Sequence, residues 1–300
     1  MRAGTQADIA VIGGSGLYDM DGLKRVRSVR VNTPFGKPSD AIVLGELAGK
    51  RLAFLSRHGK GHRIRPSAIN YRANVYALKS LGVERIISVS AVGSMREQIK
   101  PGHLVLPDQF IDRTRLREGT FFDQGLVAHV AMADPICSDL SSALYQSAKR
   151  QKASVHVGGT YVCIEGPQFS TKAESNLYRS WGVDVIGMTN MPEAKLAREA
   201  EMCYATIALA TDYDCWHESE ESVTVEAILR IMRHNVLLAK QVIRDVLEQP
   251  LAPRSCGCAS ALANAIVTPP EAISTAVRKR YKLLLTGMFS SSQTRRRSHG

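Results

Sequence analysis

Two carboxylates stand at the end of an apolar run. Asp212 and Asp214 follow residues 203–210, a β-compatible segment that predicts a buried strand. Because strand side chains alternate between faces, the two acids would share one side if the strand continues. Ligands bind at the carboxyl ends of parallel strands, where partial desolvation raises the pKa of a carboxyl group and lets it hold a proton near neutral pH. The alternative is a solvated turn.

A basic loop offers a second candidate site. Residues 57–63 read RHGKGHR, with five cationic or potentially cationic side chains and two glycines. The planar fork of Arg57 suits phosphate oxygens, and glycines let the backbone approach an anion. His58 and His62 have the spacing of metal ligands on a helix, but the glycines disfavour a helix here. The loop therefore favours an anion over a metal, with a plain solvated loop as the alternative.

A glycine-rich turn follows the first predicted strand, residues 9–13. The turn reads Gly14-Ser15-Gly16, and position 19 is Asp, so the third glycine of the dinucleotide fingerprint is missing. The backbone amides and the Ser15 hydroxyl would suit a small anion. Two further strands, 84–92 and 183–186, also end in small or hydroxyl-bearing residues. This clustering at strand ends favours a ligand site.

Strand patterns alternate with helix patterns along the chain. Apolar residues recur at helical spacing from Val225 to Ile243, and Thr171 with Glu174 forms a capping-box signature. A helix capped by Ser67 and a helix starting at Thr268-Pro269-Pro270-Glu271 are also predicted. The alternation predicts an α/β fold, a single domain whose central, mixed and mostly parallel sheet is flanked by helices. Its predicted range is 1–249, and 250–300 is a C-terminal extension with a helix and a disordered basic tail.

Composition is that of an ordinary globular protein. The 300 residues are 44% apolar and 22% charged, and the formal net charge is +11. Seven basic residues and no acid lie between Arg278 and Gly300, so a solvated basic tail is favoured over nucleic-acid binding. No apolar run approaches the roughly 20 residues that span a bilayer, and no signal peptide is evident. We expect a cytoplasmic protein without membrane or nucleic-acid partners.

Six cysteines are spread between residues 137 and 258. Cys137, Cys163, Cys203 and Cys215 stand in apolar or mixed surroundings and are predicted to be core residues. Cys256 and Cys258 form a Cys-Gly-Cys motif, for which two reduced surface thiols are favoured over a strained, reducible disulfide. A zinc site would need two more ligands, and no second motif of this kind occurs. We therefore expect no metal.

Motifs in this order resemble the methylthioadenosine phosphorylases of the trimeric purine nucleoside phosphorylase superfamily. They run from about residue 8 to residue 248. The matching stretches are Ile12–Leu17 (IGGSGL), Thr33–Asp40 (TPFGKPSD), Arg57–Gly59 (RHG), Gly93–Glu97 (GSMRE), Asp108–Thr114 (DQFIDRT), Ile164–Ser170 (IEGPQFS) and Ala210–Trp216 (ATDYDCW).

The resemblance implies phosphorolysis of 5′-methylthioadenosine to adenine and 5-methylthioribose 1-phosphate, a step of methionine and purine salvage, with inorganic phosphate as co-substrate and no cofactor. It implies a homotrimer in which His129 reaches a neighbouring subunit's site. Asp212 would be the catalytic acid toward N7 of adenine. The phosphate site would comprise Ser15, Arg57, His58, Ser90, Ala91 and Thr189. The substrate site would comprise Phe169, Ser170, Met188, Asp212, Asp214, Val225, Ile228 and Leu229. The family has Thr at positions 15 and 90, and Ser keeps the hydroxyl.

The choice of substrate depends on a few positions. Members that act on 6-oxopurines carry Asn in place of Asp212 and Glu in place of Ser170, so the pair found here favours adenine. An aliphatic wall of Val225, Ile228 and Leu229 would favour a methylthio group over a hydroxyl by about 1–3 kcal/mol. The alternatives are a phosphorylase of 6-oxopurine nucleosides or methylthioinosine, and a nucleoside-binding or thiol-redox protein without catalysis.

Overall fold

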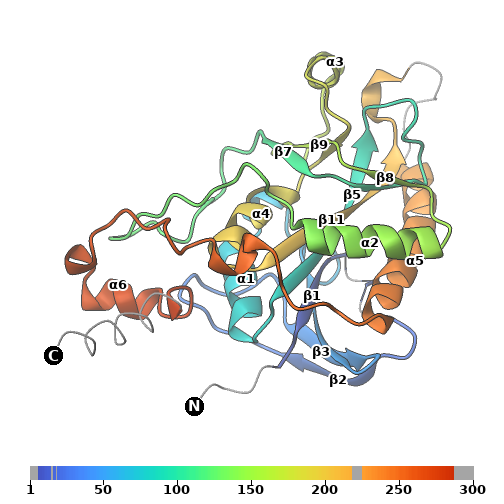
Figure 1. Ribbon diagram of the computed structural model, residues 1–300. Helices are drawn as coiled ribbons and strands as arrows, with labels where there is room; N and C mark the ends of the chain where they lie inside the picture. The colour runs from blue at the N-terminus through green and yellow to red at the C-terminus, as the bar shows by residue number, and fades with distance from the viewer. Residues whose placement is uncertain (1–5, 15, 18, 218–224, 287–300) are drawn as a thin grey trace.

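One mixed β-sheet organises the structure, a computed structural model that describes residues 6–14, 16–17, 19–217 and 225–286 (Figure 1). Its strands within these residues are β1 (Ile9–Gly13), β2 (Lys24–Val29), β3 (Ile42–Leu47), β4 (Lys50–Ser56), β5 (Arg85–Ser94), β6 (Leu104–Leu106), β7 (Gln109–Asp112), β8 (Val155–Val157), β9 (Thr160–Cys163), β10 (Val185–Gly187) and β11 (Cys203–Asp212). The order is β2-β3-β4-β1-β5-β10-β9-β7, and β11 pairs with both β5 and β6. Strand β6 also pairs with β8.

The long strand β5 positions the site. It pairs in parallel with β1 and β11 and antiparallel with β10. Because β4 is also parallel to β1, the carboxyl ends of β1, β4, β5 and β11 lie at one edge of the sheet. The α/β fold with a mixed, mostly parallel sheet is therefore confirmed. All residues of β1 and all but the last residue of β11 are buried, as expected from their apolar sequences.

Helices flank this sheet. The α-helices within the described residues are α1 (Tyr71–Ser80), α2 (Ser138–Arg150), α3 (Lys172–Ser180), α4 (Asn190–Glu199), α5 (Val225–Glu248) and α6 (Thr275–Arg280). The second and fifth helices pack together against β11, and α1 packs against α4. None of the described helices combines the length and apolarity that a membrane crossing requires. The predicted long helix α5 and the Thr171–Glu174 capping box of α3 are confirmed.

Two predicted helix starts are wrong. Ser67 lies in a 3-10 turn (η1, Pro66–Ala68), and its hydroxyl donates to Glu165 Oε1 at 2.7 Å instead of capping a helix. The extended residue Ile69 ends that turn, and Asn70 caps α1. At Thr268-Pro269-Pro270-Glu271 only another 3-10 turn forms (η4, Pro270–Ala272). Ile273 is then extended and buried in the core, so α6 begins after the Ser274 cap.

The C-terminal extension packs back on the body. Leu262, Ile273, Tyr281 and Leu285 are buried in the same apolar core as the sheet. Figure 1 shows the orange and red segment continuing to α6 beside the green segment that follows β7, as an arm at the left of the view. A bridge between Ala128 and Ile266 joins the two segments. The predicted boundary at 249/250 stays a prediction, and the predicted disordered tail falls largely outside the described residues.

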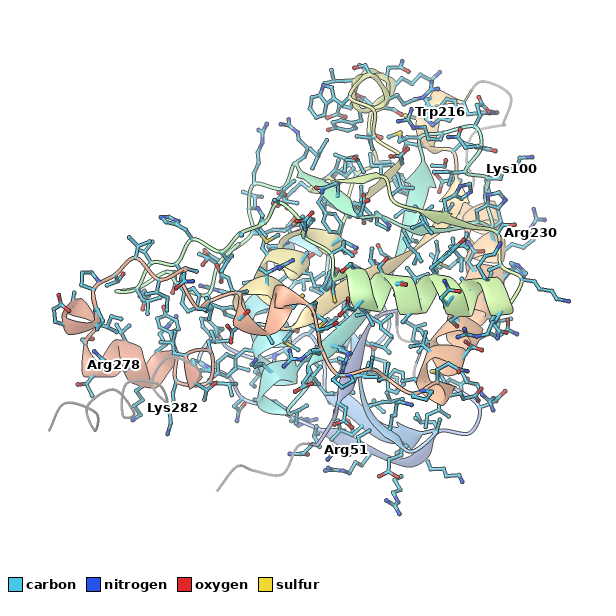
Figure 2. All side chains as sticks on the ribbon, in the orientation of Figure 1. Arg51, Lys100, Trp216, Arg230, Arg278 and Lys282 are labelled. Carbon is cyan, nitrogen blue, oxygen red and sulfur yellow. The ribbon has the colours of Figure 1, made fainter. Side chains whose placement is uncertain are left out.

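Figure 2 labels basic side chains on different parts of the molecule. Arg51, Lys100 and Arg278 lie at separate edges of the molecule in Figure 2. The absence of a nucleic-acid partner stays a prediction.

Candidate active site

The two acids come together, but not by strand alternation. The last strand, β11, ends at Asp212, and Asp214 has a φ of 52° and opens a 3-10 turn (η2, Asp214–Trp216). The strand therefore does not continue to Asp214, and a turn follows it. Both acids nevertheless meet Gly93 of β5, where an added Cβ would lie 3.0 Å from Asp212 Oδ1 and 3.2 Å from Asp214 Cβ. A glycine at 93 leaves the room in which the acids sit.

Hydrogen bonds orient both carboxylates. Asp212 Oδ1 accepts from the backbone N–H of Asp214 at 2.8 Å, and its Oδ2 accepts from the Thr211 hydroxyl at 2.7 Å. The Ser170 hydroxyl donates to Asp214 Oδ2 at 2.8 Å. The acids and Ser170 are all partly buried. Three residues predicted for the base pocket are thus brought into one hydrogen-bonded group.

An aromatic residue that the sequence analysis gave no role holds the turn that carries Asp214. Trp216 Nε1 donates to the carbonyl of Ser94 at 2.7 Å, and the guanidinium carbon of Arg179 lies 3.6 Å from the centre of the indole ring. Figure 2 shows Trp216 beside α3 at the top of the view. The strand end, the turn and α3 are therefore fixed relative to one another.

Two of the predicted phosphate-binding hydroxyls meet. Ser90 Oγ lies 3.1 Å from Thr189 Oγ1 and 3.3 Å from the hydroxyl of Tyr161. Both Ser90 and Thr189 are buried, and Ala91 follows Ser90 in β5. These hydroxyls can donate to or accept from a phosphate oxygen. Ser15, the other predicted hydroxyl, lies outside the described residues.

Arg57 does not present its fork to an open site. Its Nε and Nη2 donate to both carboxylate oxygens of Glu193 at 2.8 and 2.9 Å, and Nη1 donates to the carbonyl of Val89 at 3.0 Å. Burial acts to lower the pKa of Arg57, but the Glu193 carboxylate outweighs it and the pKa rises. The picture of a free bidentate phosphate clamp is wrong here, because a guanidinium only 2% exposed needs a carboxylate partner.

His58 is held as a neutral ring. Its Nδ1 lies 2.8 Å from the carbonyl of Ile64, so this nitrogen carries the proton and Nε2 keeps its lone pair. The ring stacks on His62 with centroids 4.1 Å apart. Burial, with the nearby positive charges of Arg57 and His62, lowers the pKa of His58 to about 4. A neutral ring can accept a hydrogen bond from a protonated phosphate oxygen.

Arg117 ties together two segments of the site and was missed by the sequence analysis. Its Nη1 donates to the carbonyls of Met188 at 2.7 Å and Met191 at 2.6 Å, and its Nε pairs with Glu165 Oε1 at 3.1 Å. Burial of Glu165 acts to raise its pKa, but hydrogen bonds from the Arg115 amide, Ser67 and others lower that pKa to about 2. No motif spacing marks Arg117, because its partners are carbonyls far away in the chain.

The remaining predicted substrate residues are placed unevenly. Met188 packs on Gly166, where an added Cβ would lie only 2.5 Å from the Met188 sulfur. Phe169 is 72% exposed, so this chain alone does not enclose it. Val225, Ile228 and Leu229 belong to α5, but their side chains lie outside those that are described.

His129 lies on the arm rather than at the edge with the acids. Its backbone N–H donates to the carbonyl of Ala265 at 2.7 Å, and the residue is exposed. This arm points away from the end of β11 in Figure 1. Within one chain the structure therefore does not bring His129 to the other candidate residues.

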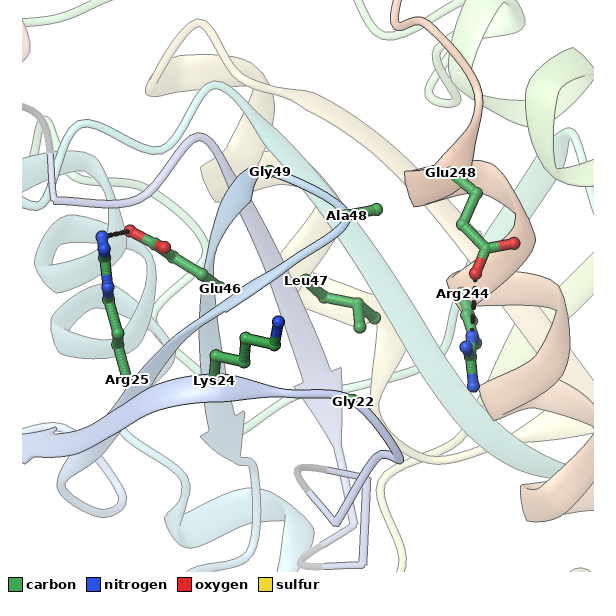
Figure 3. A pocket seen from close by; sticks show the side chains of 9 residues that line it. All are labelled: Gly22, Lys24, Arg25, Glu46, Leu47, Ala48, Gly49, Arg244 and Glu248. Carbon is green, nitrogen blue, oxygen red and sulfur yellow. Dashed lines mark hydrogen bonds and ion pairs between the residues drawn. The ribbon is translucent and has the colours of Figure 1, made fainter.

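A pocket lies elsewhere. A cavity of about 570 Å³ lies between the turn at Ala48 and Gly49 and the end of α5, and Figure 3 shows the side chains that line it. That turn precedes β4, so the cavity is at the opposite end of the sheet from Asp212. Its charged lining includes the ion pairs Arg25–Glu46 and Arg244–Glu248. We do not assign the candidate chemistry to it.

Comparisons with known proteins show the family of the chain. A family model described as "Phosphorylase superfamily" matches residues 8–248. The S-methyl-5′-thioadenosine phosphorylase of Geobacter sulfurreducens is 62% identical over 92% of this chain and 97% of its own length, and that of Koribacter versatilis is 53% identical over 96% and 99%.

Solved structures give the same result. The crystal structure of a methylthioadenosine phosphorylase from an antarctic soil metagenomic library has a TM-score of 0.89 and 52% identity, covering 94% of this chain and 99% of that one. A mutant adenosine/methylthioadenosine phosphorylase of Schistosoma mansoni in complex with adenine has a TM-score of 0.77 and 40% identity, covering 80% and 91%. The chain belongs to the S-methyl-5′-thioadenosine phosphorylases of the phosphorylase superfamily.

Proposed function

We propose that this chain cleaves the N-glycosidic bond of 5′-methylthioadenosine with inorganic phosphate, releasing adenine and 5-methylthioribose 1-phosphate. The observation that carries the proposal is the group formed by Ser170, Asp212 and Asp214 beside Gly93, at the sheet edge that also carries Ser90 and Thr189. Similarity to named relatives over nearly the whole chain supports it.

The base binds at the acid group. Asp212 donates a hydrogen bond or a proton to N7, and Asp214 accepts from the 6-amino group of adenine. Since Ser170 already donates to Asp214 Oδ2, the other oxygen of this carboxylate is available to the amino group. A carboxylate that accepts at this point selects an amino group over a 6-oxo group.

Phosphate binds on the other side of the sugar from the base. Ser90 and Gly93 are three residues apart along β5, which corresponds to about 10 Å of strand. The ribose lies between the two positions, against Met188. The Ser90 and Thr189 hydroxyls donate to phosphate oxygens, and His58 Nε2 accepts from a protonated one. Arg57, which is paired with Glu193, does not touch the phosphate in this proposal. Its positive charge attracts the anion, and its hydrogen bonds fix the loop that carries His58.

The chemistry needs charge stabilisation at both ends of the bond. As the C1′–N9 bond breaks, negative charge develops on adenine and the sugar becomes an oxocarbenium-like cation. Asp212 stabilises the leaving base at N7, and the phosphate anion stabilises the sugar before it bonds to C1′. Side chains and phosphate carry every step of this proposal, and no cofactor takes part.

Assembly completes the site. The proposal includes a homotrimer in which His129 of one subunit reaches the site of the next. Its support is the exposure of His129 on the projecting arm, together with large exposed apolar side chains, Leu116 at 74% and Phe169 at 72%. The proposed cellular location is the cytoplasm, where the products would enter methionine and purine salvage.

The test is adenine release from 5′-methylthioadenosine with and without phosphate, beside adenosine and inosine. The expected result is phosphate-dependent release from methylthioadenosine, slower release from adenosine and little turnover of inosine. A preference for inosine would contradict the roles of Asp212 and Asp214. Release without phosphate would make the enzyme a hydrolase, and binding without release would make the chain a nucleoside-binding protein.

A mixing experiment tests the shared site. His129→Ala chains and Asp212→Asn chains are each expected to have low activity. Unfolding and reassembly of the two together should restore activity, because mixed trimers contain sites with an intact Asp212 and an intact neighbouring His129. Activity that stays low in the mixture, with trimers confirmed by light scattering, would contradict the role of His129.

A further inference from the structure

Four cysteines from three distant segments meet in space. Cys137 precedes α2, Cys203 opens β11, and Cys256 and Cys258 lie at the start of a 3-10 turn in the extension (η3, Gly257–Ser260). Their four sulfur atoms all lie within 4.8 Å of one another. The sequence analysis expected no metal because no second cysteine motif occurs in the sequence. The fold brings Cys137 and Cys203 to the Cys-Gly-Cys motif and so supplies the two further ligands. The expectation of two surface thiols is also wrong, because Cys258 is buried.

The sulfur spacing fits a tetrahedral ion. Zinc–sulfur bonds of about 2.3 Å place the sulfurs of a tetrahedral site about 3.8 Å apart. The Cys203 and Cys256 sulfurs are 3.4 Å apart, and the limit of 4.8 Å bounds the other pairs. A disulfide needs about 2.05 Å, and all six cysteines are free thiols in the described structure. The cluster has the dimensions of a metal tetrathiolate.

Burial and position indicate a structural role. Cys137, Cys203 and Cys258 are between 1% and 4% exposed, and four thiolates leave no coordination position for substrate. Cys203 and Asp212 are at opposite ends of β11, about 30 Å apart along the strand. An ion here would therefore act on stability and not on the reacting bond.

The surroundings suit the negative charge of such a site. Four thiolates around a divalent ion carry a net charge of −2, because each thiol that binds releases its proton to solvent. Cys137 stands at the N-terminus of α2, whose dipole favours a thiolate. Soft thiolate ligands in a tetrahedron select zinc over harder ions.

We propose that Cys137, Cys203, Cys256 and Cys258 bind one zinc ion that fastens the C-terminal extension to the catalytic body. Without the ion, local contacts such as Ser255 Oγ to Asp139 at 2.9 Å and the Leu262 amide to Glu201 at 3.1 Å would hold this segment. The extension in turn pairs with the segment that carries His129. The zinc ion therefore also steadies the arm, and this last point alone rests on the proposed function.

The experiment measures metal in the full-length protein, purified in reducing buffer and analysed for zinc and iron by mass spectrometry. The expected content is one zinc per chain, lost in Cys256→Ser and in Cys258→Ser. Cys215→Ser, which removes a thiol outside the cluster, is expected to keep the ion. Cobalt substituted for zinc should show the sulfur-to-metal charge-transfer absorption of a tetrathiolate, which the Cys258→Ser protein should lack.

Stability gives a second readout that does not depend on activity. Stripping the ion with a chelator under reducing conditions should lower the melting temperature by several degrees, and added zinc should restore it. The Cys258→Ser protein should respond to neither treatment. Protein that binds no zinc after reconstitution with excess zinc and reductant would overturn the proposal. So would bound iron in place of zinc, or disulfides between these cysteines that persist under the same conditions.

Discussion

The Ser170 hydroxyl donates a 2.8 Å hydrogen bond to Asp214 Oδ2. The donor comes from the segment before α3 and the acceptor from the turn after β11, so this contact closes one side of the proposed base pocket. It leaves one carboxylate oxygen of Asp214 for an amino group and gives the pocket an acceptor where a 6-oxopurine needs a donor.

Ser170→Ala should therefore weaken adenine recognition while leaving the fold intact. Loss of a hydrogen bond to a charged group corresponds to about 1.5–3 kcal/mol, or roughly 10- to 150-fold in kcat/KM for methylthioadenosine. Ser170→Thr keeps the hydroxyl and should retain most of the activity. Steady-state kinetics of both variants check this, and an unchanged kcat/KM in Ser170→Ala would show that the hydroxyl does not orient Asp214 for substrate.

Asp212→Asn removes the proposed acid while keeping its size. General acid catalysis contributes typically 10²–10⁴-fold, so kcat should fall by about that factor for methylthioadenosine. An amide can serve a 6-oxo base, so the ratio of inosine to methylthioadenosine turnover should rise. Asp134→Asn, at an exposed position, is the matched control and should keep wild-type rates. Equal losses of activity for both bases would contradict a role of Asp212 in the choice between them, and an unchanged kcat for methylthioadenosine would contradict its role as the acid.

Glu193→Gln leaves the guanidinium of Arg57 buried with a neutral partner. Removing one member of a buried ion pair costs about 3–5 kcal/mol of unfolding free energy. Tyr204→Phe is the milder comparison, because it removes the 3.0 Å hydrogen bond from the Tyr204 hydroxyl to Glu193, worth about 1.5–3 kcal/mol for a charged acceptor, and leaves the ion pair in place. Urea unfolding of both variants measures the difference. Similar small losses in both would show that Arg57 finds other partners.

The strands and helices that depend on local residue patterns could be predicted from the sequence. Apolar runs located β1, β5 and β11, and helical periodicity located α5, because burial of a strand or a helix face depends on neighbouring residues. Asp212, Asp214 and Ser170 were identified from motif resemblance, and the structure joins them. Arg117, the Arg57–Glu193 pair and the four-cysteine cluster were not identified. Their partners lie dozens of residues apart or are backbone carbonyls, and no spacing rule records such contacts.

Two groups whose pKa values are shifted by burial make stability depend on pH in opposite ways. Burial lowers the pKa of His58 to about 4, so the unfolded chain binds more protons below its ordinary value of 6.5, and this group's contribution to stability is lost as pH falls from about 6.5 to 4. Burial raises the pKa of Glu199 from 4.5 to about 7, against hydrogen bonds from the Phe121 amide and Thr120. Its contribution is favourable at low pH and is lost as pH rises from about 4.5 to 7.

Glu199→Gln separates the two contributions. The amide cannot ionise, so the falling limb between pH 4.5 and 7 should disappear and the variant should gain stability relative to the wild type as pH rises through this window. A shift of about 2.5 pKa units corresponds to at most about 3 kcal/mol at pH 7. Unfolding free energies of both proteins at pH 4.5, 5.5 and 7, chosen to span the two pKa values, measure the difference. A constant difference across the three pH values would mean that Glu199 stays ionised in the folded protein, held by the Phe121 amide and the Thr120 hydroxyl at 2.7 Å each.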